Sequence, residues 1–307
     1  MTAISQKPIN TDTDILAFGS DGDGRDVTLV SAKSGAVLGA ALQNPRLIIW
    51  ENGSIKHEYP VPGLLPHPVA VGSSHLFFTS SAPTTGPIRQ AGGAQVMEIA
   101  SGRTVTIFDD LRPYAAAFGG NGLVVVGVSA AGSPELRTFS GPNFATRTAY
   151  PLPPGLLKGP LLQILSIGPN NSAVILNMVE ASFTVLDLSG GTLKIGSSRQ
   201  LGGREIAKSR EWPGGSGRPN FRRGLVMAQA PSAKGGIVAL LVPYKREDGG
   251  FRVTEYDATG SEVKSWRLAI EDSVARVDFR PSTVAWTADE IIIFTPNGLK
   301  RCYRRPS

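Results

Sequence analysis

The sequence has very little cysteine and histidine, and no long apolar segment. Cys302 is the single cysteine among 307 residues, so no disulfide forms within the chain and no zinc site of several cysteines exists. The three histidines, His57, His67 and His75, are scattered, which is more typical of surface or capping residues than of metal ligands. No apolar run approaches the roughly 20 residues that cross a membrane, so we expect no membrane span.

The motifs of several large enzyme classes are also missing. The chain has no G-x-S-x-G nucleophile elbow, no P-loop, no G-x-G-x-x-G and no H-E-x-x-H zinc motif. The N-terminal stretch "MTAISQKPINTDTD" has no apolar core and is no signal peptide as written. We therefore expect no common catalytic set and no cofactor, and a cytoplasmic protein unless the true N-terminus is missing, in which case it is exported.

Short apolar segments bounded by turn residues dominate what is present. Stretches such as "RLIIW", "GLVVVGV" and "EIIIFT" are typical of β-strands, and convincing amphipathic helices are absent. An apolar strand, a small polar residue with glycine and a second strand recur at a mean interval of 49 residues. Tight hairpin turns favour glycine because they need a positive φ. The turn glycines are Gly53, Gly102, Gly141, Gly190, Gly260 and Gly298.

This period in an all-β chain predicts a β-propeller. Two further strands precede each hairpin, which gives six blades of four antiparallel strands, with seven blades or a pair of β-sandwiches as alternatives. The first blade would begin with "DVTLVSA" and "AVLGAA", leaving "DILAF" at residues 14–18 to pair with the last blade or to form an arm. We therefore expect an N-terminal arm and closing strand over residues 1–26 and a single propeller domain over residues 27–307.

The repeats resemble the β-propeller superfamily in its sequence-divergent form, the kind grouped with WD40-, NHL- or TolB-like repeats. The resemblance covers residues from about 27 to 305. The Gly-His and Trp-Asp marks of WD40 repeats are absent, and so are kelch double glycines at repeating positions. The resemblance therefore implies a propeller and identifies no specific family.

Three aspartates stand close together in the stretch "GSDGDGRD". Asp21, Asp23 and Asp26 resemble the aspartate-rich loops of calcium-binding repeats, because calcium prefers several oxygen ligands from a tight turn. The twelfth position counted from Asp21 is Ala32, where an EF-hand has glutamate. The calcium loops of integrin-type propellers recur blade after blade, whereas this loop occurs once. We therefore interpret it as a turn, with these aspartates as calcium candidates.

The net charge of +6 is concentrated in two segments. Residues 202–223 hold six Lys and Arg against two Glu, and residues 298–307 hold four Lys and Arg and no acid. In propellers generally, the connections between blades share a face with the loops joining strands two and three, and the longest connections of this chain belong to these two kinds. That face is the candidate binding site, because loops carry function on a stable scaffold. The candidate residues are Arg204, Lys208, Arg210, Trp212, Arg218, Arg222, Arg223, Lys245 and Arg246.

The first functional hypothesis is a non-catalytic, monomeric propeller that binds another protein or an anionic ligand through this basic face. Nucleic acid is disfavoured, because aromatic and basic residues do not alternate. Two plainer interpretations remain open: the basic residues serve only solubility, and Trp212 packs its loop onto the body instead of contacting a partner.

The second hypothesis is a metal-dependent hydrolase. Some six-bladed propellers of similar layout hold a metal at the central channel, where it activates water for lactone or ester hydrolysis. This resemblance implies Asp, Glu or Asn ligands from several blades, converging within reach of one metal ion. The candidates near strand starts or loops are Asp26, Asp110, Asn177, Glu180 and Asp278.

Overall fold

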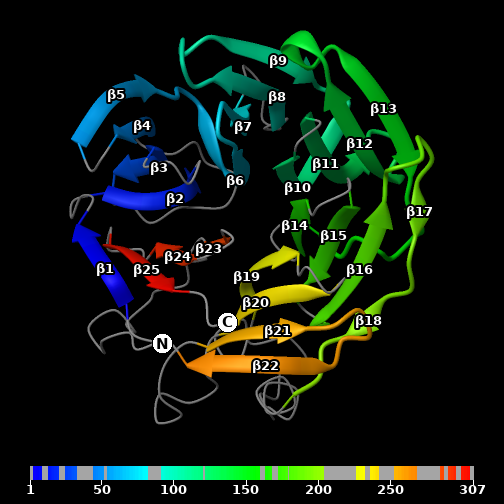
Figure 1. Ribbon diagram of the computed structural model, residues 1–307. Coiled ribbons are helices and arrows are strands. Elements are labelled where there is room, and N and C mark those ends of the chain that lie inside the picture. The colour runs from blue at the N-terminus through cyan, green and yellow to red at the C-terminus, as the bar shows by residue number, and fades with distance from the viewer. Residues whose placement is uncertain are drawn as a thin grey trace, which may run out of the picture. The chain divides into compact units, whose positions relative to one another are not determined.

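The structure is a computed structural model in which β-strands form nearly all of the described chain (Figure 1). Within the described residues, the single helical element is the short 3₁₀ turn Pro142–Phe144, and no helix has the length and apolar character that crossing a membrane requires. The described residues are 3–8, 13–20, 25–32, 44–51, 54–81, 91–119, 122–159, 163–167, 172–178, 180–203, 226–231, 236–241, 252–267, 284–286, 290–294 and 299–304.

The chain divides into two compact units, and each consists of small antiparallel sheets. The N-terminal unit is Pro8–Leu165, and the C-terminal unit is Ser166–Ser307 together with Met1–Lys7. The sheets of the N-terminal unit follow chain order: β2 (Thr13–Ser20), β3 (Arg25–Ala32), β4 (Arg46–Glu51) and β5 (Ser54–Pro60); β6 (Leu64–Val71), β7 (His75–Ser81), β8 (Ala91–Glu98) and β9 (Thr104–Phe108); β10 (Leu111–Gly119), β11 (Gly122–Ser129), β12 (Pro134–Ser140) and β13 (Thr146–Pro151).

The C-terminal unit contains two sheets in chain order and one composite sheet. In the composite sheet, strand β1 from the start of the chain forms hydrogen bonds with β25 near its end. The sheets are β14 (Gln163–Ile167), β15 (Ser172–Asn177), β16 (Ser182–Asp187), β17 (Lys194–Ile195) and β18 (Arg199–Gln200); β19 (Val226–Pro231), β20 (Ile237–Leu241), β21 (Arg252–Tyr256) and β22 (Glu262–Arg267); and β1 (Ala3–Pro8), β25 (Leu299–Arg304), β24 (Glu290–Phe294) and β23 (Val284–Trp286).

Four-stranded meanders in series are propeller blades, but the prediction of six blades with four consecutive strands each is wrong. Five blades consist of consecutive strands, and one of them has a fifth strand, because β17 and β18 both pair with β16. The composite sheet takes its outer strand from β1 instead. The alternatives of seven blades and of a sandwich pair are wrong as well.

The error begins at the N-terminus. The segment "DILAF" does not pair with the last sheet; it lies in β2, the first strand of the first blade, and "AVLGAA" lies outside the described residues. The closing strand is β1, whose sequence "AISQKP" has no strong strand pattern. The division into an arm over residues 1–26 and one domain over 27–307 stays a prediction.

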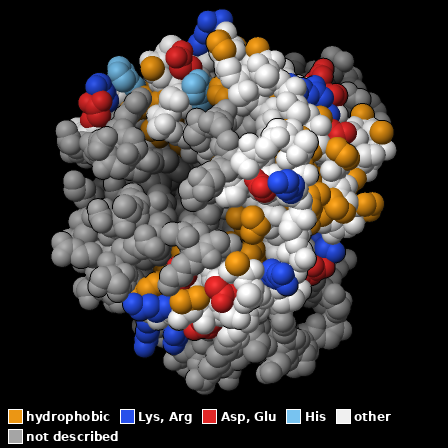
Figure 2. All heavy atoms as spheres, turned by 45° about the vertical axis from the view of Figure 1, so that its right-hand side comes forward, with side chains coloured by type: hydrophobic (Ala, Val, Ile, Leu, Met, Phe, Trp, Pro, Cys, Tyr) orange, Lys and Arg blue, Asp and Glu red, His pale blue; other side chains and the backbone are white. Residues whose placement is uncertain are grey.

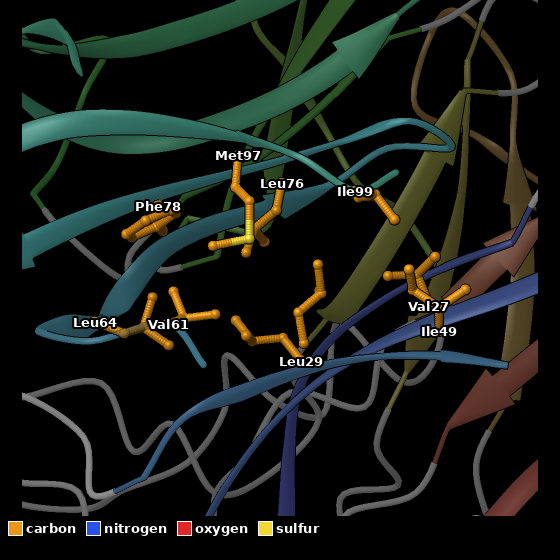
Figure 3. Close-up of a cluster of buried hydrophobic side chains, with 10 residues drawn as sticks. Val27, Leu29, Ile49, Val61, Leu64, Leu76, Phe78, Met97 and Ile99 are labelled. Carbon is orange, nitrogen blue, oxygen red and sulfur yellow. The ribbon is translucent and has the colours of Figure 1, made fainter. Parts of the chain in front are cut away.

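Apolar side chains of neighbouring blades pack together. Figure 3 shows side chains from the first blade pointing toward side chains from the second. Each such side chain contributes about 1.5–3 kcal/mol when fully buried. The cluster consists of Val27, Leu29, Leu47, Ile49, Val61, Leu64, Leu76, Phe78, Met97 and Ile99.

A second cluster joins the second blade of the N-terminal unit to the third. Three phenylalanines stack in series there: the Phe77 and Phe108 ring centroids are 6.3 Å apart, and those of Phe108 and Phe139 are 5.3 Å apart. Such pairs add about 0.5–1.5 kcal/mol beyond area burial. Aromatic stacking thus stabilises the contact between these blades.

Two of the turn glycines have a second role besides turn geometry. Gly102 has a φ of 69°, and a Cβ added there would lie 2.7 Å from the Tyr59 ring of the preceding blade. The Tyr59 hydroxyl donates a hydrogen bond to the Ala100 carbonyl in the same turn, at 3.0 Å. Gly260 has a φ of 87°, and its Cβ would overlap the Gln200 carbonyl oxygen. In both turns glycine lets the outer strand of the preceding blade approach closely.

Candidate functional site

The basic candidate residues of the sequence lie outside the described part of the chain. The described strands still fix which connections carry them, because residues 204–225 join β18 to β19 and residues 242–251 join β20 to β21. The first is a connection between blades and the second joins strands two and three of a blade, as the sequence predicted. The residues concerned are Arg204, Lys208, Arg210, Trp212, Arg218, Arg222, Arg223, Lys245 and Arg246.

In three blades, a backbone hydrogen bond links the connection to the next blade with the loop between strands two and three. The residue just after the outer strand donates its N–H to a carbonyl at the start of strand three or just before it, with a distance of 2.8 or 2.9 Å each time. The donor side chains are almost fully buried. The three pairs are Val61 with Pro45, Leu152 with Pro134, and Leu201 with Ala181. This repeated bond places the inter-blade connections beside the loops between strands two and three.

The basic connection, which joins β18 to β19, begins with residues that are buried and hydrogen-bonded. Leu201 is 1% exposed, and the N–H of Gly202 donates to the carbonyl of Gly260, in the β21–β22 turn, at 2.9 Å. A Cβ added at Gly203 would overlap the Glu262 carboxylate. The segment 204–223 therefore begins at a fixed point where two blades of this unit meet.

In the N-terminal unit, Asp110 stands at the centre of a charged cluster. Its carboxylate accepts hydrogen bonds from Arg137 at 2.5 Å and from Arg147 at 2.9 Å. Arg137 is 3% exposed, also pairs with Glu135 at 2.9 Å, and lies over the Phe108 ring at 5.8 Å. This cluster was not predicted from the sequence, because Arg137 and Glu135 lie in a strand of mixed polarity, "PELRTFS".

The cluster fixes the charge of its central carboxylate. The hydrogen bond from Arg137 is the largest cause that lowers the pKa of Asp110, to about 2, and the bond from Arg147 adds to it. Both carboxylate oxygens are engaged by guanidinium groups, so Asp110 serves neither as a proton donor near neutral pH nor as a free metal ligand. The hydrolase candidate Asp110 has a structural role here.

Among the described residues, the hydrolase candidates form no common metal site. The buried Asn177 accepts a hydrogen bond from the backbone N–H of Glu180 at 3.1 Å, within the turn between β15 and β16. Asp26 belongs to β3, opposite Trp50, while Asp278 lies outside the described residues. In the described part of the chain, no group of three His, Cys, Asp or Glu residues is arranged to hold a metal ion.

Two of the three calcium candidates, Asp21 and Asp23, lie outside the described residues. They fall between β2 and β3, whose ends pair Ser20 with Asp26. Residues 21–24 therefore connect two adjacent antiparallel strands, and the interpretation of this loop as a turn stays a prediction. The assignment of these aspartates as calcium ligands stays a prediction.

His75 occupies an aromatic environment that the sequence did not indicate. Its ring lies 4.9 Å from the Phe144 ring, edge to face, and 6.4 Å from the Phe118 ring, while its Nδ1 is hydrogen-bonded to the Ser74 hydroxyl at 2.8 Å. Burial lowers the pKa of His75, partly offset by Glu98. Phe144 has a φ of 58°, so this packing holds a residue in a conformation that favours glycine.

The two units differ in charge. The N-terminal unit holds 10 Lys and Arg against 11 Asp and Glu, a net charge of −1, while the C-terminal unit holds 21 against 14, a net charge of +7. In the view of Figure 2, blue and red side chains of the described surface lie mostly in neighbouring spots, with white and orange surface between them. The excess positive charge belongs to the C-terminal unit, which contains both basic segments.

No protein-family model matches this chain, and no curated protein matches its sequence. Solved structures resemble it in fold. A gluconolactonase from Xanthomonas campestris aligns with a TM-score of 0.54 at 8% identity, over 98% of this chain and 89% of that protein. The calcium-binding protein regucalcin from Agrobacterium tumefaciens aligns with a TM-score of 0.51 at 10% identity, over 98% and 94% of the two chains. U3-55K aligns with a TM-score of 0.55 at 13% identity, over 99% and 81%.

These structural alignments show a shared fold. At identities of 8–13% they do not show a shared function. The neighbours include a lactonase, a calcium-binding protein and U3-55K, so the fold by itself selects no activity among them. The all-β architecture and the resemblance to propellers are confirmed, and the chain has the β-propeller fold.

Proposed function

We propose that this protein is a non-catalytic β-propeller that binds an acidic protein or another anionic ligand through the basic connection between β18 and β19. The observation that carries the proposal is the division of charge, with +7 in the C-terminal unit and −1 in the N-terminal unit. Residues 202–223 alone contribute a net +4. A local excess of one sign attracts partners of the opposite sign and speeds their association.

The fixed start of this connection supports the proposal. Because Leu201 and Gly202 are held by backbone hydrogen bonds, the basic segment leaves the body at a defined point. A segment with a fixed start loses less conformational freedom when it binds than one with a loose start. The residues proposed to contact the partner are the nine of the candidate set, with Lys245 and Arg246 on the β20–β21 connection.

The hydrolase alternative receives less support. Asp110 is engaged by two arginines and Asn177 by a turn N–H, so neither candidate presents free oxygens to a metal ion. The similarity to a gluconolactonase at 8% identity concerns the fold alone. A lactonase assay with added calcium, zinc and manganese would still be the direct test of this alternative.

Heparin affinity chromatography tests the proposal. Replacing Arg218, Arg222 and Arg223 with serine removes three positive charges from the basic connection. We expect the variant to elute at lower salt, and the slope of log retention against log salt to fall by about 2 to 3, because roughly one counterion is released per neutralised charge.

A matched variant controls for the loss of net charge. Arg103, Arg112 and Lys158 are exposed residues of the N-terminal unit, and replacing them with serine removes the same three charges elsewhere. This variant should elute close to the unmodified protein. Equal shifts in both variants would show that retention follows net charge alone, and the proposal would be abandoned.

A further inference from the structure

The outer strand of a blade presents an edge to which another strand can add, and most outer strands of this protein are irregular. The pairing of β5 with β4, of β9 with β8 and of β22 with β21 contains a register shift. The outer position beside β16 is split between β17 and β18. Such irregularities are devices that prevent edge-to-edge association.

Strand β13 lacks this protection. It pairs with β12 in unbroken register from Glu135↔Pro151 to Ser140↔Thr146, and no described strand lies on its other edge. Figure 1 shows it on the outside of its sheet. Residues 146–149 are all exposed. Among the outer strands whose pairing is described, β13 alone is both continuous and regular.

No unpaired charged side chain among residues 146–149 protects this edge from pairing with another strand. The one ionisable side chain among residues 146–149 is Arg147, and it is paired with Asp110 at 2.9 Å. Natural edges are often protected by a lysine or another charge that a neighbouring strand would have to bury unpaired. Here the charge is already compensated within its own blade.

The backbone groups that face outward follow from one hydrogen bond. The N–H of Leu152 donates to the carbonyl of Pro134, directly after the β12–β13 pairing ends. Hydrogen-bonded and non-bonded pairs alternate along an antiparallel ladder. Thr148, an even number of residues away, therefore directs its N–H and C=O toward β12. Arg147 and Ala149 direct theirs toward the open edge.

We propose that this edge pairs with the same edge of a second copy of the chain. An antiparallel pairing centred on Thr148 sets Arg147 of one copy opposite Ala149 of the other. Both residues offer outward N–H and C=O groups, so the two symmetric pairs form four hydrogen bonds. The contact is isologous and closes after two copies.

The side chains suit this register. Thr148 stands opposite Thr148 of the second copy, and Thr146 stands opposite Tyr150, which are favourable cross-strand combinations. No like charges face each other, because Arg147 is opposite Ala149. A register centred on Arg147 would set two arginines opposite each other and is disfavoured. The self-complementary sequence is the reason to choose a second copy over a foreign strand, and the proposal departs from the monomer expected from the sequence.

The substitution Ala149→Pro tests the edge directly. It removes an N–H that points outward and leaves the β12–β13 bonds intact, and proline is tolerated on edge strands in this orientation. We expect light scattering after size exclusion to show the unmodified protein shifting from 32.4 kDa toward twice that mass as its concentration rises. The Ala149→Pro protein should stay at 32.4 kDa, and Ala149→Ser, which keeps the N–H, should behave as the unmodified protein.

A second variant changes no backbone group. Thr148→Lys sets two ammonium groups opposite each other across the interface, so it should weaken the dimer at low salt and recover part of it at high salt. A single monomeric mass of the unmodified protein at every concentration would overturn the proposal. So would a dimer that persists unchanged in both Ala149→Pro and Thr148→Lys, or binding of a foreign strand without self-association. The heparin variants leave residues 146–149 unchanged, so dimerisation affects them and the unmodified protein alike, and the two proposals fail separately.

Discussion

Removing the charge of Asp110 should destabilise the protein in a way that depends on pH. In Asp110→Asn, the almost fully buried guanidinium of Arg137 keeps only Glu135 as a charged partner. The pKa of Asp110 falls from 3.8 to about 2, which would correspond to about 2.4 kcal/mol for a buried group. Because 48% of the Asp110 side chain is exposed, solvent screening reduces this to about 1 kcal/mol.

The sign of the pH dependence follows from the direction of the shift. The folded state lowers the pKa of Asp110, so its contribution is complete above the unfolded value of 3.8 and is lost as the pH falls toward 2. Urea unfolding followed by far-UV circular dichroism at pH 7, 5 and 3 measures the difference in unfolding free energy between the two proteins. We expect about 1 kcal/mol at pH 7 and 5, and a smaller difference at pH 3.

Asp109→Asn is the matched control, because Asp109 is the exposed neighbour and forms no ion pair with the described residues. This variant should change stability by less than about 0.5 kcal/mol. An unchanged unfolding free energy of Asp110→Asn at pH 7, or a loss that is the same at pH 3 as at pH 7, would contradict a stabilising role of the ionised Asp110.

Three further predictions concern other parts of the chain. Gly102→Ala should lower the melting temperature more than Gly132→Ala, because both have positive φ but only Gly102 is approached by the Tyr59 ring; equal losses would exclude the close approach as a cause. Because burial lowers the pKa of His75, stability should fall as the pH drops below about 6.5, and His75→Gln should remove that part of the pH profile in thermal melts. Calcium should leave the melting temperature unchanged if residues 21–26 form a plain turn, whereas a rise of several degrees that EDTA reverses would identify a calcium site.

The architecture was predictable where it depends on local pattern. Short apolar strands and turn glycines such as Gly102 and Gly260 predict hairpins, because the turn geometry requires a positive φ at these positions. The composite sheet was not predictable in the same way. Strand β1 has a polar sequence and joins the sheet through a partner almost 300 residues away, so no local pattern reveals it.

The candidate site also combines features that the local sequence predicts with features that depend on residues far apart in the chain. Clustering of arginine in residues 202–223 is visible in the sequence, and the described strands place that segment between two blades. The cluster around Asp110 was missed as a structural unit, because Arg137 and Arg147 reach it from different strands. The open edge of β13 was missed because regular pairing is a property of two strands together, while sequence analysis considers each strand by itself.

The pairing of β1 with β25 has a consequence for synthesis of the chain. At about 5–20 residues per second, a ribosome needs roughly 15–60 seconds to make the residues that separate the two strands. Throughout that time β1 has no β25 to pair with, while the consecutive blades can already form. Completion of the composite sheet is therefore the last and most non-local step, and contacts of this kind make folding slow. In a newly made chain, the first strand, β1, is therefore the strand that is most exposed to incorrect pairing.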